Sequence, residues 1–574
     1  MNLFETYRNH VLDALERVAP GFNTAAVTLE PPRDASHGDL STNAAMVVGG
    51  QAKMKPRELA DKLAEQLRAL PDVTEVSVAG PGFINMRLAP SVWQGMVGTI
   101  LVHGVGFGNS TIGANKRVNV EYVSANPTGP LHIGHARGAV YGDALATLLM
   151  KAGYNVTREY YINDAGAQIE VLARSALLRY RETLGETITI PEGLYPGDYL
   201  RGVGDALKAK FGDALLKKPE SAQIADAKAI AIDCMMALIK QDLFDLGIVH
   251  DVFTSEAALR DSGAIERAIE QLQAAGHLYQ GTLEPPKGET PDDWEAKEQL
   301  LFRATAFGDD MDRTVQKSDG NYAYFAGDLA LTMDKLRRHF EVLIYMLGAD
   351  HGGYVKRLKA IAGAFSNNTV EADVLLCQLV RLTKNGEPVK MSKRAGTFVT
   401  VRDVLDEVGR DILRFVMLMR KSSQDMDFDL AKVKEQSKDN PVFYVHYAHA
   451  RAKSLLRMGR EQVAEAFENS QAPTAALLAL LTHPAELALI RLLASWPRQV
   501  EQAALAHEPH RVIYYLQEVA ASFHGLWNEA DLRFIQPQMP ELTAARLALA
   551  RAMAVVLASG LAVCGVEPVE ELRG

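Results

Sequence analysis

The sequence predicts an α/β protein with a central parallel sheet, a small α/β domain before it and an all-helical domain after it. Residues 117–152 read as a strand, a loop and a helix, which is the opening unit of a parallel sheet. Helical and strand patterns mix before this unit, whereas helical periodicity dominates from residue 401 onward. These observations set the expected order of the domains.

The length of the chain requires several domains. A chain of 574 residues is too long for one hydrophobic core, because such cores stop growing at roughly 250–300 residues. We expect a small domain over residues 1–110 and the sheet domain over residues 115–400, with a mostly helical insertion at about residues 170–300. A helical domain follows over residues 401–574. Closely spaced glycines between residues 104 and 113 mark the first linker.

The individual elements follow from local patterns. Helical patterns over residues 4–18 and 56–70 precede the alternating strands VTEVSVAG and GFINMRLA. The strand RVNVEYV then leads through SANPTGP into a helix over residues 132–152. After the insertion, the sheet resumes with NYAYFAG and EVLIYMLG, and the strand-like LCQLVRL precedes the loop TKNGEPVKMSKRAGTF.

Composition and charge exclude several classes of protein. The net charge of −10, from 61 basic and 71 acidic residues, argues against a protein that coats nucleic acid, but it permits a local basic surface. Three widely spaced cysteines predict neither a disulfide framework nor a cysteine zinc site. The start lacks a signal-peptide pattern, and the apolar stretch 553–566 is too short to span a bilayer. We therefore expect a cytoplasmic protein with no membrane partner.

The strongest motif is PTGPLHIGH, between the predicted strand and helix. His132 and His135 share one face of the first helical turn because they are three residues apart. Gly134 allows close backbone approach, and a helix N-terminus attracts phosphate. Such histidines are more often ordinary helix-start residues or part of a metal site, but no further metal ligand accompanies them. The position directly after a strand favours a nucleotide site.

A second motif, KMSKR, lies in a loop bounded by Gly386 and Gly396. Clustered cations usually form a solvated surface. Three cations in five residues can also neutralise the charge that develops when pyrophosphate leaves a nucleotide. The loop is therefore a candidate phosphate-binding element.

Together, the two motifs resemble the HIGH and KMSKS signatures of class I aminoacyl-tRNA synthetases. Arg394 replaces the usual final serine, and both lysines are retained. Within that class, the chain resembles arginyl-tRNA synthetases over nearly its whole length. The segments that carry this resemblance are EYVSANPTGP, YYINDAG, SDG with Tyr324 and Asp328, LGADH, NP with YAHAR, HGDL and GPGFIN. Leu331 departs from the family, whose members often carry an aromatic residue there.

The resemblance implies a Rossmann-type catalytic domain, an N-terminal domain that contacts the tRNA elbow and a helical anticodon-binding domain. It implies activation of L-arginine by ATP, with Mg²⁺ accompanying the nucleotide, and transfer of arginine to the terminal adenosine of tRNA(Arg). The expected catalytic residues are His132, His135, Lys390 and Lys393. The expected ATP-binding residues are Pro130, His132, Gly134, His135, Gly348, Asp350, His351, Lys390, Met391, Ser392 and Lys393. No metal bound by protein side chains is expected.

Arginine recognition follows from chemistry as well as from the resemblance. A guanidinium group needs planar bidentate acceptors, which carboxylates provide, and Asp328 is our first choice. The resemblance adds Tyr324 beside it, and Glu121, Ser124 and Asn126 at the α-amino and carboxylate end of the substrate. Without the flanking motifs, Tyr324 and Asp328 would be interpreted as ordinary packing and capping residues.

Contacts with tRNA are expected from Asn163, Asp164, Tyr447 and Arg451. The last two lie in a basic stretch with interleaved rings, over residues 432–453, which suits unpaired bases. Such a pattern is more often an amphipathic helix with one solvated side. We expect a monomer.

Two other functions stay open. One is a class I synthetase for another amino acid or a small nucleotidyltransferase with a HIGH sequence, and the length and helical C-terminus weigh against the small transferase. The other is a catalytically silent relative that binds RNA as a regulator. The intact HIGH motif and both loop lysines argue against it.

Overall fold

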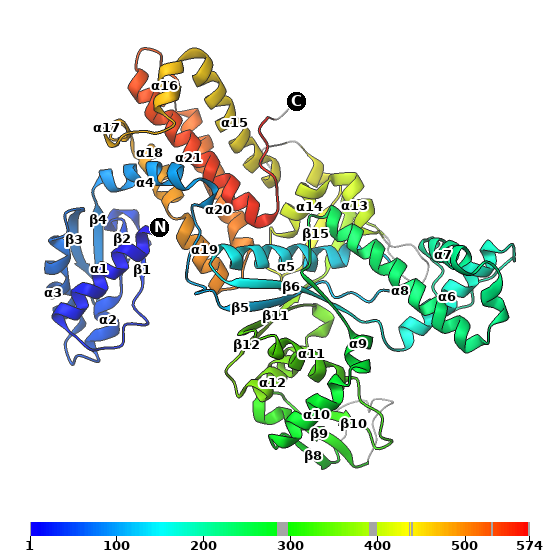
Figure 1. Ribbon diagram of the computed structural model, residues 1–574. Helices are drawn as coiled ribbons and strands as arrows, with labels where there is room; N and C mark the ends of the chain where they lie inside the picture. Colours follow the sequence, from blue (N-terminus) through cyan, green and yellow to red (C-terminus); the bar gives the residue numbers. More distant parts are fainter. Residues whose placement is uncertain are drawn as a thin grey trace. The chain divides into compact units, whose positions relative to one another are not determined.

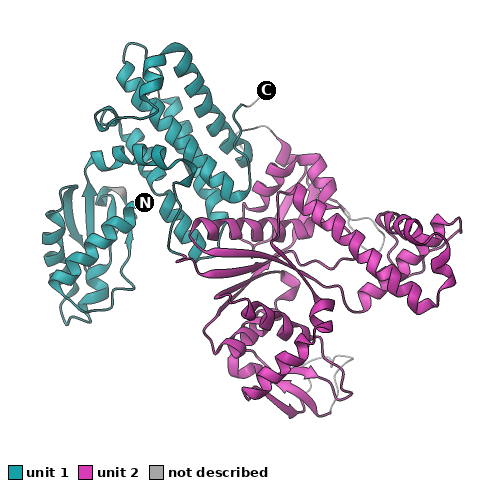
Figure 2. Cartoon of the chain, viewed as in Figure 1, with its two compact units in different colours: residues 1–112, 436–574 teal, residues 113–435 magenta. Residues whose placement is uncertain are grey.

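The chain divides into two compact units (Figure 2). The computed structural model describes residues 2–283, 297–389, 399–435, 437, 440–529 and 532–571. Unit 1 comprises Met1–Ile112 and Gln436–Gly574, and unit 2 comprises Gly113–Glu435. The second division falls at residue 435 rather than at the expected residue 401, because a strand over Met426–Asp429 (β15) pairs in parallel with one over Val380–Lys384 (β13). This pairing holds the intervening helices in unit 2.

Unit 2 is built on a five-stranded parallel sheet in the order β12-β11-β5-β6-β7 (Figure 1), which confirms the predicted fold class. Its strands are β5 (Arg117–Glu121), β6 (Asn155–Ile162), β7 (Val252–Ser255), β11 (Val342–Gly348) and β12 (Glu371–Cys377). Helices α5 (Ile133–Lys151) and α12 (Tyr354–Ser366) connect neighbouring strands. β5 comes first in the chain but lies in the middle of the sheet, between β6 and β11. Ligands bind at the carboxyl ends of the strands beside such a switch point.

The connection from β6 to β7 is helical and has its own core. Its elements are α6 (Ala167–Thr183), η3 (Asp198–Leu200), α7 (Arg201–Phe211), η4 (Ala214–Lys217) and α8 (Glu220–Asp245). Buried side chains such as Leu172, Leu207 and Met235 form this core. The helical subdomain therefore folds around apolar contacts of its own, beside the sheet.

The connection from β7 to β11 differs from expectation. It contains α9 (Glu256–Asp261), α10 (Ala264–Ala274), β8 (Leu278–Gly281), β9 (Gln299–Phe302), η5 (Ala304–Phe307), β10 (Arg313–Gln316) and α11 (Phe325–Arg337). The segment NYAYFAG was expected to be a strand, but it ends in the first turn of α11. Its apolar residues, including Phe325 and Ala326, are buried as part of the helix. Strands β8 to β10 form a separate antiparallel sheet in the order β10-β9-β8.

The last part of unit 2 is a platform next to the expected lysine loop. It consists of β13, β14 (Glu387–Pro388), α13 (Val401–Val408), α14 (Arg410–Met417), β15 and η7 (Lys432–Lys434). Arg137 of α5 is buried and donates hydrogen bonds to the carbonyl oxygens of Gln378, Lys421 and Gln424. These bonds fix the platform to the helix that follows the PTGPLHIGH segment.

Unit 1 joins the two ends of the chain. Its antiparallel sheet has the order β1-β2-β4-β3. The elements before residue 112 are α1 (Leu3–Val18), β1 (Leu29–Glu30), η1 (Ala35–His37), β2 (Leu40–Thr42), α2 (Ala44–Gly49), α3 (Pro56–Arg68), β3 (Val73–Ala79), β4 (Phe83–Leu88), α4 (Pro90–His103) and η2 (Gly104–Gly106). The helices after residue 436 are α15 (Pro441–Gln462), α16 (Ala464–Asn469), α17 (Ala475–Leu478), α18 (Pro484–Ala494), α19 (Trp496–Leu505), α20 (His510–Asn528) and α21 (Pro540–Cys564). The predicted helices and strands of the small domain agree with α1, α3, β3 and β4.

Helix α4 was not predicted, and it packs against the C-terminal helices α18 and α21. Gln94 donates hydrogen bonds to the carbonyl oxygens of Ala479 and Leu481, and Ser559 donates to those of Val105 and Phe107. The C-terminal helices therefore take part of their core from the N-terminal segment.

Helix α21 corrects the expected length of the last apolar segment. It begins at residue 540 and has 25 residues, so among the described residues it is the one helix long and apolar enough to cross a membrane. However, 78% of its most apolar window is buried inside the protein. Its contacts with α4, α15 and α20 are those of a core helix.

Candidate functional site

A strained turn follows β5 at the switch point of the sheet. Val123 and Ser124 have φ values of +69° and +39°, a region that a β-branched residue rarely adopts and that costs about 1–3 kcal/mol per residue. The amide of Ser124 donates to the carbonyl oxygen of Tyr122 at 3.0 Å, which closes a γ-turn. This turn ends β5 at Glu121, two residues earlier than predicted.

The turn places Ser124 between two strands. Its hydroxyl donates to Glu121 Oε1 at 3.2 Å and accepts a hydrogen bond from the amide of Tyr161 at 3.1 Å. Asn126 follows, and its side-chain amide donates to Gln168 Oε1 at 2.8 Å. Three predicted residues, Glu121, Ser124 and Asn126, therefore lie along one edge of the sheet.

The two histidines of the PTGPLHIGH segment form the N-terminus of α5. His132 is the N-cap residue, and its backbone amide donates to Nδ1 of His135 at 3.3 Å. The two rings stack with their centroids 3.7 Å apart. A side chain at Gly134 would meet the His132 ring at 3.0 Å, so glycine keeps this turn compact. The helix N-terminus and both imidazoles thus face one cavity, an arrangement that suits an anionic ligand.

A cavity of about 270 Å³ lies against this helix end. Its lining residues are Ala125, Asn126, Thr128, Gly129, Pro130, His132, His135, Gln168, Tyr195 and Tyr199. Tyr199 belongs to the helical connection, and its hydroxyl donates to the carbonyl oxygen of Thr128 at 2.9 Å. The helical connection thereby closes one wall of the cavity.

The lysine loop was expected to complete this site, but Lys390, Met391, Ser392, Lys393 and Arg394 lie outside the described residues. The segment that follows the loop is described. The amide of Ile133 donates to the carbonyl oxygen of Val399 at 3.3 Å, and the amide of Val401 donates to that of Leu131 at 2.8 Å. The segment after the loop is therefore fixed to the backbone of the first motif.

The third group of predicted nucleotide-binding residues follows β11. Gly348 is the last residue of the strand, and Asp350 and His351 form a 3₁₀ turn after it. Their side chains are 81% and 51% exposed, and Oδ2 of Asp350 lies 3.6 Å from Nε2 of His351. β11 is the parallel neighbour of β5, so these residues lie at the same edge of the sheet as Glu121.

Asp328 lies in the first turn of α11, and its Oδ2 atom is buried without a hydrogen-bond partner. Burial raises the pKa of this carboxyl from 3.8 to about 7; Arg357 lowers it, whereas Glu121 and Glu256 raise it further. Tyr324, one helical turn earlier, is 64% exposed. A buried carboxylate without a partner is a binding group for a cation.

Glu256 and Tyr161 complete an acidic cluster around Asp328. A Cβ atom at Gly327 would lie 3.7 Å from Glu256 Oε1 and 4.0 Å from the Tyr161 hydroxyl. Burial and the carboxylates Glu256, Asp328 and Glu121 raise the pKa of Tyr161. Glu256 is paired with Arg260, and Arg357 acts on Asp328. The buried Oδ2 of Asp328 therefore remains the oxygen that can accept hydrogen bonds from a positively charged ligand.

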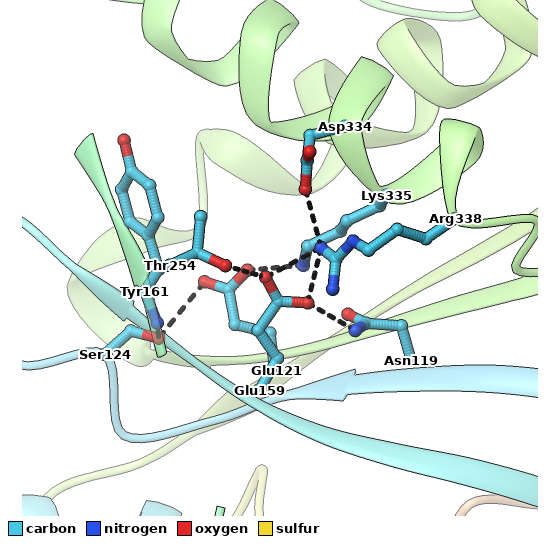
Figure 3. A network of polar contacts seen from close by, with 9 residues as sticks. All are labelled: Asn119, Glu121, Ser124, Glu159, Tyr161, Thr254, Asp334, Lys335 and Arg338. Carbon is cyan, nitrogen blue, oxygen red and sulfur yellow. Dashed lines mark hydrogen bonds and ion pairs between the residues drawn. The ribbon is translucent and has the colours of Figure 1, made fainter. Parts of the chain in front are cut away.

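Behind this cluster lies a buried network of charged groups (Figure 3). Lys335 of α11 forms an ion pair with Glu121 Oε2 and has no exposed side-chain surface. Arg338 binds both oxygens of Glu159, at 2.8 and 2.9 Å, and pairs with Asp334. Burial raises the pKa of Glu159, but Lys335 and Arg338 outweigh burial and hold this pKa below its usual value.

Asn163 and Asp164, both expected to contact tRNA, differ in their surroundings. The Asn163 side chain donates to the carbonyl oxygen of Ser124 at 3.5 Å. Asp164 is buried, and its two oxygens accept hydrogen bonds from the Ser255 hydroxyl and the Ala257 amide. These hydrogen bonds hold the start of α9, and the expected tRNA contacts of Asn163 and Asp164 stay predictions.

Tyr447 and Arg451 meet on α15 in unit 1, as expected for neighbours four residues apart. The Arg451 guanidinium lies 4.2 Å from the centroid of the Tyr447 ring and 4.6 Å from that of Trp527. Tyr447 stacks against His524, and Tyr447 and Trp527 remain 43% and 37% exposed. The cluster combines exposed rings with a cation, which suits stacking of unpaired bases.

Several residues of these sites were not predicted from the sequence. Glu256, Lys335, Tyr199 and Trp527 carry no local signal, because each is a single residue in an ordinary helical or loop pattern. The sequence TSE at the end of β7 contains one weak sign, a serine N-cap directly before Glu256. Within the described residues, no group of three or more His, Cys, Asp or Glu side chains is placed to hold a metal ion.

Three protein-family models match consecutive parts of the chain. "Arginyl tRNA synthetase N terminal domain" matches residues 5–88. "tRNA synthetases class I (R), catalytic domain" matches residues 96–189 and 295–444, and "DALR anticodon binding domain" matches residues 445–572. Along the chain, the three models match first the small N-terminal domain, then parts of the sheet domain and then the C-terminal helices.

Comparison with whole proteins also identifies arginyl-tRNA synthetases as relatives of this chain. The chain is 57% identical over 585 residues to a protein from Parvibaculum lavamentivorans and 56% identical over 589 residues to one from Rhizobium meliloti, both named "Arginine--tRNA ligase". Each alignment covers 100% of both chains. Among solved structures, a Campylobacter jejuni protein described as a "putative arginyl t-RNA synthetase" is 30% identical, has a TM-score of 0.72, and covers 84% of this chain and 100% of its own. The Thermus thermophilus arginyl-tRNA synthetase, 19% identical with a TM-score of 0.74, shares the fold over 99% of this chain and 100% of its own.

Proposed function

Because the chain belongs to the arginyl-tRNA synthetase family, we propose that the edge of the sheet after β5 and β11 is where arginine is activated by ATP. The protein is an arginine–tRNA ligase with a class I catalytic domain, so ATP, arginine and tRNA are its substrates. The observation that carries the assignment of the arginine pocket is the buried Oδ2 of Asp328, which has no partner. We assign a role to each residue of this site.

Asp328 binds the guanidinium group of the substrate in this proposal. A bidentate guanidinium would supply the hydrogen-bond donors that Oδ2 of Asp328 lacks, together with a further positive charge. Glu256 and Tyr161 line the same region, and the exposed ring of Tyr324 covers it from one turn earlier on α11. The negative cluster would therefore select a cationic side chain over a neutral side chain of similar length.

Glu121, Ser124 and Asn126 bind the other end of arginine. Oε1 of Glu121 accepts one hydrogen bond from Ser124, and a carboxylate oxygen can accept a second one, here from the α-ammonium group. Asn126 lies between Ser124 and the cavity beside His132. The α-carboxylate would thus point toward the nucleotide, where it must attack the α-phosphorus.

ATP occupies the cavity at the N-terminus of α5 and extends toward β11. Gly134, Pro130, His132 and His135 would hold the phosphates at the helix N-terminus. The expected partners at the far side are Gly348, Asp350 and His351, and the expected partners of the leaving pyrophosphate are Lys390, Met391, Ser392 and Lys393. Activation is then an in-line displacement at the α-phosphorus that depends on positioning and charge stabilisation.

Mg²⁺ would accompany the nucleotide. The ligands of the ion would include phosphate oxygens and water, which Mg²⁺ prefers. The ion would neutralise phosphate charge. The histidines and lysines of the chain would orient the triphosphate around it.

The tRNA(Arg) contacts are divided between the units. We assign the domain over residues 5–88 to the tRNA elbow and the cluster of Tyr447, Arg451 and Trp527 to the anticodon loop. Asn163, beside Ser124, would meet the acceptor end. We further propose a cytoplasmic monomer without a membrane partner, which agrees with the burial of α21.

The test is arginine-dependent exchange of labelled pyrophosphate into ATP, with and without tRNA(Arg). We expect exchange to require the tRNA, since its binding energy can order the pocket and the lysine loop. RNA with an oxidised terminal adenosine prevents charging from competing with exchange. Full exchange without RNA would refute this requirement, and exchange that persists at normal arginine KM after Asp328→Asn would refute the arginine pocket.

A further inference from the structure

Lys335 is a charged residue in an unusual place. Its side chain has no exposed surface, and its ammonium group lies 4.2 Å from the centroid of the Tyr345 ring as well as in the ion pair with Glu121. Burial alone would lower the pKa of Lys335, but Glu121, Tyr345 and Glu159 together outweigh burial and raise this pKa above the usual value. A buried ion pair is seldom more stabilising than apolar residues of the same size. We therefore relate the presence of this ion pair to the function of Glu121.

The two oxygens of Glu121 have separate partners. Oε2 binds Lys335, and Oε1 accepts the hydrogen bond from the Ser124 hydroxyl (Figure 3). Ser124 is held in turn by the amide of Tyr161 on the neighbouring strand. Lys335 thus fixes the rotation of the carboxylate, and the strained turn fixes the hydroxyl that faces it.

The other charged residues of the network do not orient the Glu121 carboxylate. Arg338 is 27% exposed and binds Glu159 and Asp334, and Glu159 also accepts hydrogen bonds from Asn119 and Thr254. Within the described part of the chain, the ion pairs of Arg338 are with these two carboxylates and not with Glu121. Both cations act on the charge of Glu159, but the ion pair with Glu121 belongs to Lys335. Arg338, the residue after α11, therefore offers a control for Lys335.

We propose that Lys335 is a positioning residue for substrate recognition, which holds the Glu121 carboxylate in the orientation that receives the α-ammonium group of arginine. The proposal rests on the assignment of the α-amino end to Glu121 and Ser124. Without Lys335, Oε2 of Glu121 would lose its ion-pair partner, and the carboxylate could rotate away from the Ser124 hydroxyl.

The test compares arginine with 5-guanidinopentanoate, which is arginine without its α-amino group. The KM for arginine and the inhibition constant of the analogue are measured in the tRNA-charging assay with the full chain. For Lys335→Met, we expect the arginine KM to rise about 10–100-fold, the range of a hydrogen bond to a charged group. The inhibition constant of the analogue should stay within about threefold, because the analogue makes no contact at Glu121.

Two further variants distinguish a positioning role of Lys335 from a general loss of folding. The double variant Lys335→Met with Glu121→Gln removes both charges, so it should fold even if Lys335→Met does not. If Lys335 acts through Glu121, its kinetics should equal those of Glu121→Gln alone. Arg338→Met should lose thermal stability and keep both constants.

The outcomes separate the possible failures. Equal losses for arginine and the analogue, an added loss in the double variant, or an equal change in Arg338→Met would each overturn the positioning role. Normal constants for Glu121→Gln would overturn the proposal together with the assigned contact at Glu121. In every one of these cases, charging of tRNA(Arg) by the unchanged protein shows that the ligase activity itself stands.

Discussion

The two ends of the candidate active site are built differently. At the arginine end, Glu121 and Lys335 form a buried ion pair, and Asp328 has a buried oxygen without a partner. At the nucleotide end, the side chains of Asp350 and His351 are mostly exposed, and the histidines lie at a helix N-terminus. The first end is shaped by desolvated charge, and the second by backbone geometry and the helix dipole.

The difference reflects what each ligand needs. An arginine side chain keeps its charge throughout the reaction, so a fixed, buried carboxylate can bind it in the ground state. The triphosphate gains charge at the leaving group only in the transition state, so groups that act there affect the rate more than the binding. Substitutions at the arginine end should therefore change KM, and those at the nucleotide end should change kcat.

Asp328→Asn should give the largest effect, a rise of about 10²–10³-fold in the KM for arginine, since breaking a buried charge pair costs about 2–5 kcal/mol. The value of kcat should change much less. The control is Asp334→Asn on the same helix, which contacts Arg338 and should keep a normal KM. An unchanged arginine KM for Asp328→Asn would remove this residue from the pocket.

The same variant should be more stable than the parent protein when no arginine is bound. Burial raises the pKa of Asp328 to about 7, so the folded state binds its proton more tightly than the unfolded state. This contribution to the free energy of unfolding is complete below pH about 4, falls as the pH rises, and is lost above pH about 7. Thermal unfolding at pH 8 should show a higher Tm for Asp328→Asn, which rules out a folding defect as the cause of the raised KM.

Lys393→Ala tests the nucleotide end and should lower kcat by about 10²-fold, because it removes a charge that meets the leaving pyrophosphate. The KM for arginine should stay within a few-fold. Lys384→Ala is the control, since Lys384 pairs with Glu407 on the platform. A large rise in arginine KM at unchanged kcat would reverse the roles that we assign to the two ends.

The pH dependence of arginine binding should also separate the two ends. A substrate guanidinium binds the ionised form of Asp328, and a proton competes with it, so the arginine KM should rise about tenfold per pH unit below pH about 7 and level off above it. The KM for ATP should not follow this curve. Asp328→Asn should lack the rise, and a parent protein with a flat profile between pH about 5.5 and about 8 would contradict the assignment.

Trp527→Ala should have the smallest effect and should leave both ends unchanged. The loss of a partly exposed stacking ring should raise the KM for tRNA(Arg) by about 5–10-fold, which is the lower end, about 1 kcal/mol, of what such contacts contribute per base. The KM values for arginine and ATP should remain normal. Tyr514, another exposed ring of α20, provides the matched substitution, and an equal loss there would argue against a specific contact at Trp527.

The sequence predicted the elements with long, regular patterns. Helices α1, α3 and α5 and strands β3 and β4 have enough turns or alternations to be recognised. Strands β7 to β10 have only four residues each, too few to show a period. The segment NYAYFAG alternates like a strand, but packing of Phe325 and Ala326 in the unit 2 core favours a helix from residue 325.

The candidate site was predicted only where motifs define it. The histidines and Asp328 belong to recognisable segments, and the structure places them at the edge of the sheet. Lys335 and Glu256 were missed because their importance depends on burial, which arises from tertiary packing around single charged residues. Helix α4 was missed for a related reason, since its partners α18 and α21 lie at the other end of the chain.

The long sequence separation between α4 and its partner helices affects folding during synthesis on the ribosome. Unit 2 is one continuous stretch, whereas α4 must wait for α21, which begins about 440 residues later. At a synthesis rate of ~5–20 residues per second, the wait is roughly 20–90 s. For most of this time, until α17 and α18 are synthesised, the apolar face of α4, with Trp93 and Val97, has no native partner from the C-terminal helices. The nascent chain is therefore exposed to aggregation and chaperone capture until its last helix emerges.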